Sequence, residues 1–383
     1  MMKIAIVGLV SYENFGDQII GETVEYLVKQ YGNVNTELID FSLDGKEGTF
    51  LQLAYKTFRK WKWKRTTDWL LMKKYKKCYK RELFKRISDC DGIIFSCGSF
   101  KYGTQNLWAQ YSVITAYTDI HKIPVMFNAM NVQKADLTNF KCRYLRKCLD
   151  YACVKYFTSR DGMAGVERIK KDYTNRRKLK VYPAADPAFW IPETYNISRK
   201  VTSDRIGINV IAPNRFLMYG GTLPPEEVKK AYITMLDKLS KRGFTWQLFT
   251  NGMREDNDFA FELANTVQEG KDERVRIPGS ASELVGMVAN YKAVFGARLH
   301  SMICAYSLGV PVSGIIWDEK IVHFAEMAKL ENLFLSESEI TGEAMFDNVM
   351  KSLQREDDSE NRDFWKNTTR KTIFEFLDNI KQF

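Results

Sequence analysis

The sequence predicts an α/β protein made of two Rossmann-like domains, each built on a parallel sheet. Short apolar segments of strand length alternate with segments of helix length along nearly the whole chain. Such alternation is typical of parallel sheets that are covered by helices on both faces. Residues 191–204 interrupt it with polar residues, a proline and no periodicity, and so predict a linker. At 383 residues the chain is long enough to form two domains with separate cores.

The predicted linker divides the chain into domains. We expect an N-terminal domain at residues 1–190, with a basic helical insertion at about 51–87, and a C-terminal domain at 205–342. Residues 343–383 are expected to be mostly helical. In the N-terminal domain, apolar runs predict strands at 3–9, 35–41, 91–96, 124–130 and 155–159, and apolar residues at helical spacing predict helices at 17–31, 51–63, 69–87, 104–121, 137–152 and 163–173.

Apolar runs and helical spacing also predict the elements of the C-terminal domain. They predict strands at 205–211, 245–250, 274–277, 293–295 and 312–317, and helices at 224–242, 256–268, 282–290 and 301–308. Gly309 and Pro311 stop the last of these helices. The strand before it ends at a glycine turn, and Arg298 and His300 follow this turn directly.

Arg298 and His300 form the strongest candidate for a site. They lie at the carboxyl end of a predicted strand, where open parallel sheets bind ligands. They also precede a helix, whose N-terminal N–H groups favour negative charge. The sequence therefore predicts an anion site here, although a helix start that merely happens to carry an arginine and a histidine stays open as an alternative.

The positive charge of the chain belongs to one segment. The formal net charge is +10. Residues 55–86 hold fourteen Lys or Arg and two acids, a net charge of +12, so the rest of the chain carries −2. Trp61, Trp63 and Trp69 lie among these cations, a mixture that suits a membrane interface with anionic lipid. A helical hairpin packed on the sheet explains the segment equally well, whereas no recognised nucleic-acid module accompanies it.

Composition and spacing argue against several other classes. The seven cysteines form no C-x-x-C pair, and the three histidines are far apart, so we expect reduced thiols and no metal site. No signal peptide is recognisable. The longest nearly uncharged run, residues 301–317, is broken by glycine and proline and is shorter than a membrane span. We expect a cytoplasmic protein that is at most peripheral on the inner face of the membrane.

Two motifs resemble those of a known family. Arg298-Leu299-His300 is followed by a small-residue helix, a Gly-Val-Pro turn, an apolar strand and Asp318-Glu319-Lys320. Near the N-terminus, an apolar strand leads to Gly8 and to Asn14-Phe15-Gly16-Asp17, which opens a helix. Both motifs resemble those of polysaccharide pyruvyl transferases. A third motif departs from the family, because Ser96-Cys97-Gly98-Ser99 replaces the run of glycines that many members carry.

The resemblance implies a fold, a reaction and a set of residues. It implies a GT-B-like architecture, with two Rossmann-like domains facing a cleft and a C-terminal helix that crosses back to the first domain. It implies transfer of the enolpyruvyl unit of phosphoenolpyruvate, as co-substrate and without a further cofactor, to a sugar of a lipid-linked precursor of a cell-surface polysaccharide. Arg298 and His300 match the catalytic Arg-x-His. The loops with Gly8, Asn14, Gly16, Asp17 and Gly98 would face the cleft.

Phosphoenolpyruvate carries a carboxylate and a phosphate, so its site needs more than one cation. Besides Arg298, we consider Arg160, Arg215 and Lys320 as donor-binding residues. Arg160 and Lys320 each have a simpler alternative, namely an ion pair with a neighbouring acid: Asp161 for Arg160, and Asp318 or Glu319 for Lys320. Two other functions stay open at this point: a GT-B glycosyltransferase that uses a nucleotide sugar, and a non-catalytic protein whose basic segment binds an anionic membrane or an acidic partner.

Overall fold

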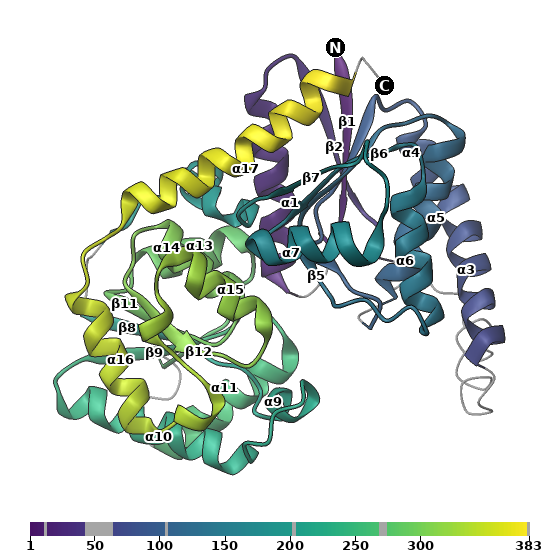
Figure 1. The fold of residues 1–383 in the computed structure, drawn as a ribbon. Helices are drawn as coiled ribbons and strands as arrows, with labels where there is room; N and C mark the ends of the chain where they lie inside the picture. The colour runs from purple at the N-terminus through teal and green to yellow at the C-terminus, as the bar shows by residue number, and fades with distance from the viewer. Residues whose placement is uncertain (11–13, 43–63, 104–105, 201–203, 268–273, 381–383) are drawn as a thin grey trace. The chain divides into compact units, whose positions relative to one another are not determined.

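A computed structural model of the chain describes residues 1–10, 14–42, 64–103, 106–200, 204–267 and 274–380. The chain folds into two compact units, each with a parallel β-sheet between layers of helices (Figure 1). Unit 1 comprises Met1–Ser11, Val24–Asp186 and Thr368–Phe383, and unit 2 comprises Tyr12–Thr23 and Pro187–Asn367. The predicted α/β class with two parallel sheets is confirmed.

Two helices continue from one unit into the other. α1 (Phe15–Gln30) begins in unit 2 and ends in unit 1, as does α17 (Ser359–Asn379). Residues 12–23 thus belong to unit 2, although they lie within the N-terminal domain that the sequence predicts. Residues 191–204, the predicted linker, also belong to unit 2 and begin with helix α8 (Ile191–Tyr195).

The sheet of unit 1 has the strand order β2-β1-β3-β5-β6-β7, and the short strand β4 pairs with β5. The strands are β1 (Met2–Gly8), β2 (Val34–Asp40), β3 (Gly92–Phe95), β4 (Ser99–Phe100), β5 (Val125–Val132), β6 (Val154–Ser159) and β7 (Lys180–Pro183). All neighbouring strands are parallel, for example Ile4 opposite Gly92. Strands β3 and β5 are buried along their whole length, as expected where helices cover both faces.

The helices of unit 1 form two layers. One layer contains α3 (Lys64–Arg81), α4 (Leu83–Ile87), α5 (Leu107–Ile120) and α6 (Phe140–Asp150) (Figure 1). On the other face α1 meets the last turns of α17, where the ring of Tyr31 lies edge-on to Phe374 at 5.3 Å and its hydroxyl donates to Asp378. Helix α7 (Gly162–Arg168) precedes β7. The single helix that the sequence predicts at 69–87 is two helices, because Glu82 leaves helical geometry (φ −125°, ψ −66°).

The sheet of unit 2 has the strand order β10-β9-β8-β11-β12-β13. The strands are β8 (Arg205–Asn209), β9 (Thr245–Phe249), β10 (Val275–Arg276), β11 (Ala293–Gly296), β12 (Val312–Ile315) and β13 (Phe334–Leu335). One face carries α10 (Pro225–Lys241), α11 (Arg254–Val267) and α16 (Gly342–Gln354); the other carries α13 (Ala281–Ala289), α14 (Leu299–Ser307) and α15 (Glu319–Ala328). This strand order is that of the dinucleotide-binding Rossmann fold.

Some elements differ from the prediction. The sequence patterns did not predict α15, the short helix α9 (Asn214–Met218) or the strands β4, β7 and β13. The helix predicted at 51–63 lies outside the described residues.

All seven cysteines are free thiols, and burial raises the pKa of Cys90 and Cys148 to about 11 and that of Cys153 to about 12. These three thiols therefore stay protonated at neutral pH and act as small apolar side chains.

Candidate functional site

The strand order of unit 2 determines where a ligand site can form. β8 and β11 lie side by side, but the chain leaves β8 toward β9 and leaves β11 toward β12, in opposite directions. The helices that follow these strands lie on opposite faces of the sheet, and open parallel sheets bind ligands at such a point, beyond the carboxyl ends of the strands. Asn209 ends β8 and Gly296 ends β11. Arg298 and His300 therefore lie at the position where this fold binds ligands.

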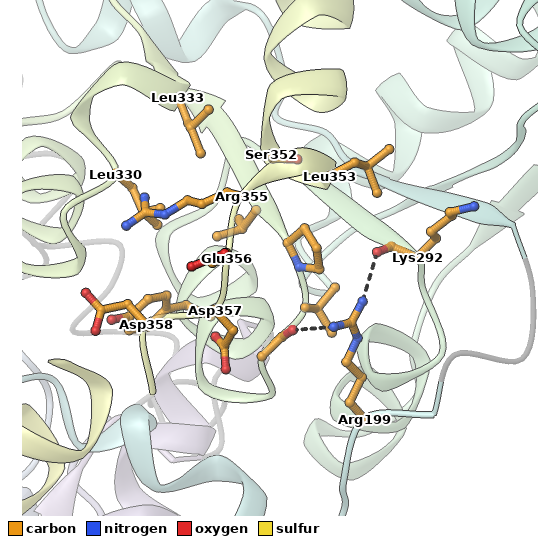
Figure 2. Close-up of a pocket in the computed structure, with 15 residues that line it drawn as sticks. Arg199, Lys292, Leu330, Leu333, Ser352, Leu353, Arg355, Glu356, Asp357 and Asp358 are labelled. Carbon is orange, nitrogen blue, oxygen red and sulfur yellow. Dashed lines mark hydrogen bonds between the residues drawn. The ribbon is translucent and has the colours of Figure 1, made fainter. Parts of the chain in front are cut away.

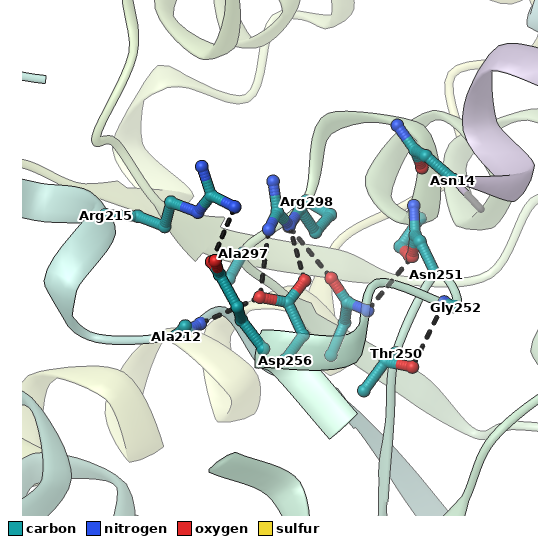
Figure 3. A network of polar contacts seen from close by, with 12 residues as sticks. Asn14, Ala212, Arg215, Thr250, Asn251, Gly252, Asp256, Ala297 and Arg298 are labelled. Carbon is teal, nitrogen blue, oxygen red and sulfur yellow. Dashed lines mark hydrogen bonds and ion pairs between the residues drawn. The ribbon is translucent and has the colours of Figure 1, made fainter. Parts of the chain in front are cut away.

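Two buried asparagines hold the loop after β11. The Oδ1 atom of Asn209 accepts a hydrogen bond from the backbone N–H of Arg298 at 2.8 Å (Figure 3). Its amide donates to Oδ1 of Asn251 at 3.2 Å, and the hydroxyl of Ser301 donates to the same Asn251 oxygen. Both asparagines are almost completely inaccessible to solvent. The backbone that carries Arg298 and His300 is therefore fixed by the end of β8, which neighbours β11, and by the segment after β9, which lies one strand further away.

Asp256 fixes the side chain of Arg298. This aspartate lies in the first turn of α11 and is fully buried. Its two carboxylate oxygens accept from Nε and Nη2 of Arg298 at 2.7 and 2.9 Å, and one of them also accepts from the backbone N–H of Ala212 at 2.9 Å. The bidentate pair uses one edge of the guanidinium, and Figure 3 shows the other edge pointing away from Asp256. Arg298 is thus an oriented cation with N–H donors left to bind an anion.

His300 lies in the first turn of α14, which begins two residues earlier than the sequence predicts. Arg298 occupies the N-cap position of this helix, and the imidazole of His300 is buried, with 8% of the residue exposed. The positive end of the helix dipole therefore adds to the charge of Arg298 at the same place. The site combines a cation, a titratable imidazole and a helix N-terminus.

The Asn-x-Gly-Asp turn of the N-terminal region packs directly on this imidazole. A Cβ atom at Gly16 would lie only 2.2 Å from Nδ1 of His300, so residue 16 must be glycine for the two segments to approach this closely. The N–H of Phe15 donates to the backbone oxygen of Asn251 at 3.0 Å, and the amide of Asn14 donates to Asp17 at 3.0 Å. Two motifs almost 300 residues apart in sequence thus form one structure in unit 2.

We expect Gly16→Ala to lower the stability of unit 2. Gly16 is in a helix, where alanine is otherwise favoured by about 0.5–1 kcal/mol, but here the added methyl group overlaps His300 and should cost about 1–3 kcal/mol. Gly286→Ala in α13 is the matched control, because nothing lies within 4 Å of a Cβ at that helical glycine. Thermal unfolding should show a lower midpoint for Gly16→Ala and an unchanged or higher one for Gly286→Ala. Equal stabilisation by both would contradict the close packing.

Trp317 forms an aromatic wall beside Arg298. Its indole N–H donates to the backbone oxygen of Ala297 at 2.6 Å, which fixes the ring. The guanidinium of Arg298 lies 5.6 Å and the ammonium of Lys320 4.9 Å from the ring centroid, both within the range of cation–π attraction. Tyr219 meets the same ring edge-on at 4.9 Å. Trp317 thus brings two of the predicted cations to one surface.

Arg215 and Lys320, the predicted cations of unit 2 besides Arg298, have acidic neighbours. Arg215, on α9, pairs with Glu255 at 2.6 Å, and its side chain lies on the same side of the network as Arg298 (Figure 3). Lys320 lies in α15, 3.5 Å from Asp318, which caps that helix. Glu255 is mostly exposed, so the pair with Arg215 holds that guanidinium only weakly. Arg298, Arg215 and Lys320 therefore belong to one region of unit 2.

Arg160 lies in unit 1 and has a different partner from the one that the sequence suggests. It follows β6 and forms a buried ion pair with Asp186, whereas Asp161 accepts from the amide of Asn131 at 2.8 Å and the N–H of Val132 at 2.6 Å. Both members of the Arg160–Asp186 pair are at most one tenth exposed. Arg160 therefore anchors the segment after β7, and a role in donor binding stays a prediction.

The predicted glycines of unit 1 lie at the switch point of that sheet. Gly8 ends β1, and a Cβ there would lie 2.5 Å from the hydroxyl oxygen of Ser96, which follows β3. Gly98 has a φ of +64° and its carbonyl accepts from the N–H of Asn131 at 3.0 Å. Glycine is thus required at residue 8 by close packing and favoured at residue 98 by left-handed backbone geometry.

The three predicted membrane contacts are Trp61, Trp63 and Trp69. Trp61 and Trp63 lie outside the described residues, and of Trp69 only the backbone, in α3, is described. No described helix is long and apolar enough to cross a membrane. Within the same part of the chain, no group of three or more His, Cys, Asp or Glu side chains could hold a metal ion.

A cavity in unit 2 lies at the end of the sheet opposite to Arg298 and His300. It has a volume of about 320 Å³ and is bordered by Lys292 and Pro311, which precede β11 and β12 (Figure 2). Arg199 donates to the backbone oxygens of Gly309 at 2.8 Å and Lys292 at 3.4 Å, so this cation joins two loops. Because parallel sheets bind ligands at the carboxyl ends of their strands, this cavity is the weaker candidate.

Sequence reasoning missed the residues that orient the predicted pair: Asn209, Asn251, Asp256 and Trp317. For Asn209 and Asn251 the sequence does contain a pattern that could have identified them. Each asparagine ends or closely follows a short apolar strand, where a polar side chain points to the ligand edge of the sheet. Acidic residues are common in the first turn of a helix, so nothing in the sequence distinguishes Asp256. Its pairing with Arg298 becomes visible only in the folded structure.

Comparisons with known proteins agree with this geometry. The structure is similar to UDP-GlcNAc 2-epimerase from Methanocaldococcus jannaschii (TM-score 0.60, 9% identity, 98% of this chain and 99% of that one). It is also similar to S. aureus MnaA in a co-structure with UDP (TM-score 0.56, 9% identity, 100% and 97%). At such low sequence identity, these similarities show only that the chain has a fold of the GT-B type. A search of curated proteins finds no match.

The family model described as polysaccharide pyruvyl transferase matches residues 14–319, a span that runs from the Asn-x-Gly-Asp turn past Arg298 and His300. This match covers most of the chain and includes both motifs that meet in unit 2. The chain therefore belongs to the polysaccharide pyruvyl transferase family.

Proposed function

We propose that the protein transfers the enolpyruvyl group of phosphoenolpyruvate to a sugar of a lipid-linked polysaccharide precursor and closes a pyruvate ketal. Family membership supports the reaction class. We assign phosphoenolpyruvate as the donor because Asp256 holds Arg298 in one orientation, beside His300 and the N-terminus of α14. A doubly anionic donor needs such fixed cations, and a guanidinium can pair with a carboxylate or a phosphate through two parallel N–H groups.

In the proposed reaction His300 donates a proton to the methylene carbon of the donor. The double bond supplies the electron pair for the new C–H bond, and the neighbouring carbon becomes oxocarbenium-like. A sugar hydroxyl attacks this carbon and loses its proton, and the bond to the phosphate oxygen breaks to release inorganic phosphate. A second sugar hydroxyl then attacks and loses its proton, which completes the ketal. Imidazole suits the first step because histidine can exchange a proton near neutral pH.

The positive charges of the site would stabilise the donor through these steps. Arg298 would hold one anionic group with the guanidinium edge that points away from Asp256. Arg215 and Lys320 lie in the same region and could neutralise the other group, since both sit beside residues of the Arg298 network. Fixed cations of this kind lower the barrier most where charge develops on the leaving phosphate.

Binding and turnover of the full chain test this proposal. Calorimetry should detect binding of phosphoenolpyruvate, with UDP-GlcNAc and other UDP sugars at least about tenfold weaker. Phosphate release from phosphoenolpyruvate should require a lipid-linked saccharide acceptor, and mass spectrometry should find the acceptor heavier by one pyruvate minus water. Tight binding and turnover of a UDP sugar instead would identify a glycosyltransferase. If no donor is turned over with any acceptor, the enzymatic proposal fails.

A further inference from the structure

Unit 1 contains a groove that the proposed reaction does not use. It has a volume of about 320 Å³, within the range of small-molecule sites, and lies in the helical layer of α3, α4, α5 and α6. We refer to it as the α3–α6 groove. Its wall is apolar and aromatic, with Met72 from α3, Phe84 from α4 and Val113 and Ala116 from α5.

The wall of the groove is rigid. The rings of Phe84 and Tyr117 are stacked, with centroids 3.9 Å apart and planes within 7°. The hydroxyl of Tyr117 donates to the backbone oxygen of Phe84 at 3.3 Å, so the same two residues are also linked by a hydrogen bond. The hydroxyl of Ser112, also in the lining, donates to Trp108 within its own helix at 2.6 Å. The hydroxyls of Tyr117 and Ser112 are thus bonded to the protein, and this part of the groove presents mainly hydrocarbon to a ligand.

Three lysines border this apolar wall. Lys73 and Lys76 lie three residues apart on one side of α3, and Lys147 lies on α6. None of the described residues that line the groove is acidic. The edge is also apolar in places, since Ile120 is 78% exposed and Tyr144 38% exposed. A large apolar residue so exposed beside an open apolar groove is typical of a binding surface.

We infer that the α3–α6 groove binds one alkyl chain of an anionic membrane lipid, with the headgroup on Lys73, Lys76 and Lys147. The apolar lining removes the chain from water, and the lysines supply the complementary charge. A nucleic acid would need basic residues along an extended polar track, and a free sugar would gain little from a lining that is mostly apolar. This inference concerns a site in unit 1 and does not rest on the proposed reaction.

Binding of soluble amphiphiles to the protein tests separately whether the groove recognises the alkyl chain and whether it recognises the anionic charge. Dodecyl phosphate, used below the concentration at which it forms micelles, has both the chain and the charge. Dodecyl maltoside has the chain only, and inorganic phosphate has the charge only. Calorimetry should show saturable binding of dodecyl phosphate, binding of the maltoside at least about fivefold weaker, and none of inorganic phosphate, because both contributions are required.

Variants then locate the binding. Ala116→Trp fills the groove and should weaken dodecyl phosphate at least about tenfold, and Lys76→Glu and Lys147→Glu should each weaken it about fivefold or more. Lys80→Glu is the matched control, since Lys80 is an exposed lysine of the same helix that does not line the groove. It should bind within about a factor of two of the wild type. Thermal unfolding checks that each variant is folded.

Vesicles connect this site to a membrane. The wild type should sediment with phosphatidylcholine vesicles that contain phosphatidylglycerol, and Ala116→Trp should reduce the bound fraction several-fold. Failure of dodecyl phosphate to bind would overturn the inference. So would equal weakening by Lys76→Glu and Lys80→Glu, which would show a general effect of charge, or vesicle binding that Ala116→Trp leaves unchanged, which would show attachment through another surface.

Discussion

Replacing His300 by alanine is expected to lower kcat for acceptor-dependent phosphate release about 1,000-fold, because a positioned acid or base typically contributes 100- to 10,000-fold. An imidazole can act as a general acid, whereas the guanidinium of the same Arg-x-His motif keeps its protons. The KM for phosphoenolpyruvate should change much less, since Arg298 and its partners remain in place. A coupled phosphate assay under saturating donor measures both constants.

His323→Ala is the control for this variant. His323 is a histidine of the same unit, in α15 beside Glu319 and Glu326, and has no part in the Arg298 network. It should keep turnover within about a factor of two of the wild type, as is usual for substitutions away from a site. A His300→Ala protein that is folded and still turns over at the wild-type rate would remove the proton-transfer role.

Asp256→Asn is expected to lower kcat/KM for phosphoenolpyruvate about 100-fold, the typical result of misplacing a substrate-binding group by an ångström or so. The asparagine keeps the size of the side chain but cannot accept two charge-assisted hydrogen bonds from Arg298. A mostly buried guanidinium without its carboxylate should also cost about 3 kcal/mol of unfolding free energy. Activity is therefore measured well below the unfolding midpoint of the variant, with the midpoint recorded separately.

Glu262→Gln is the control for Asp256→Asn. It shows whether the loss of any ion pair on the same helix would lower activity and stability in the same way. Glu262 also lies in α11 and pairs with Lys229 at 2.6 Å, but it is 55% exposed and lies in no part of the site network. Exposed pairs contribute at most about 1 kcal/mol, so both stability and kcat/KM should stay close to those of the wild type. If Asp256→Asn is as active as Glu262→Gln, Asp256 does not position Arg298 for the donor.

The two family motifs have complementary roles in this structure. The Arg-x-His motif supplies the chemical groups, and the Asn-x-Gly-Asp turn supports them, because Gly16 allows α1 to begin in contact with His300. The backbone of Phe15 is tied to Asn251, the same residue that holds Asn209 and Ser301. A substitution in the N-terminal motif should therefore act through the position of His300.

Much of the fold could be predicted from local sequence. Apolar runs and helical spacing place most strands and helices within a few residues of their observed bounds, as for 245–250 against β9 and 224–242 against α10. The failures have local causes. Helix α9 is a single turn of five residues after a proline, too short to show periodicity, and α15 was missed because its start was assigned to a motif.

The sequence by itself determined the alternation of strands and helices and the placement of Arg298 and His300 after a buried strand. These features depend on residues that are neighbours in the chain, so periodicity and turn residues are sufficient to predict them. Only the tertiary structure decided that β8 lies beside β11, that Asp256 holds Arg298, and that Gly16 packs on His300. Strand order and ion-pair partners depend on how distant surfaces fit together, and no local pattern encodes that fit.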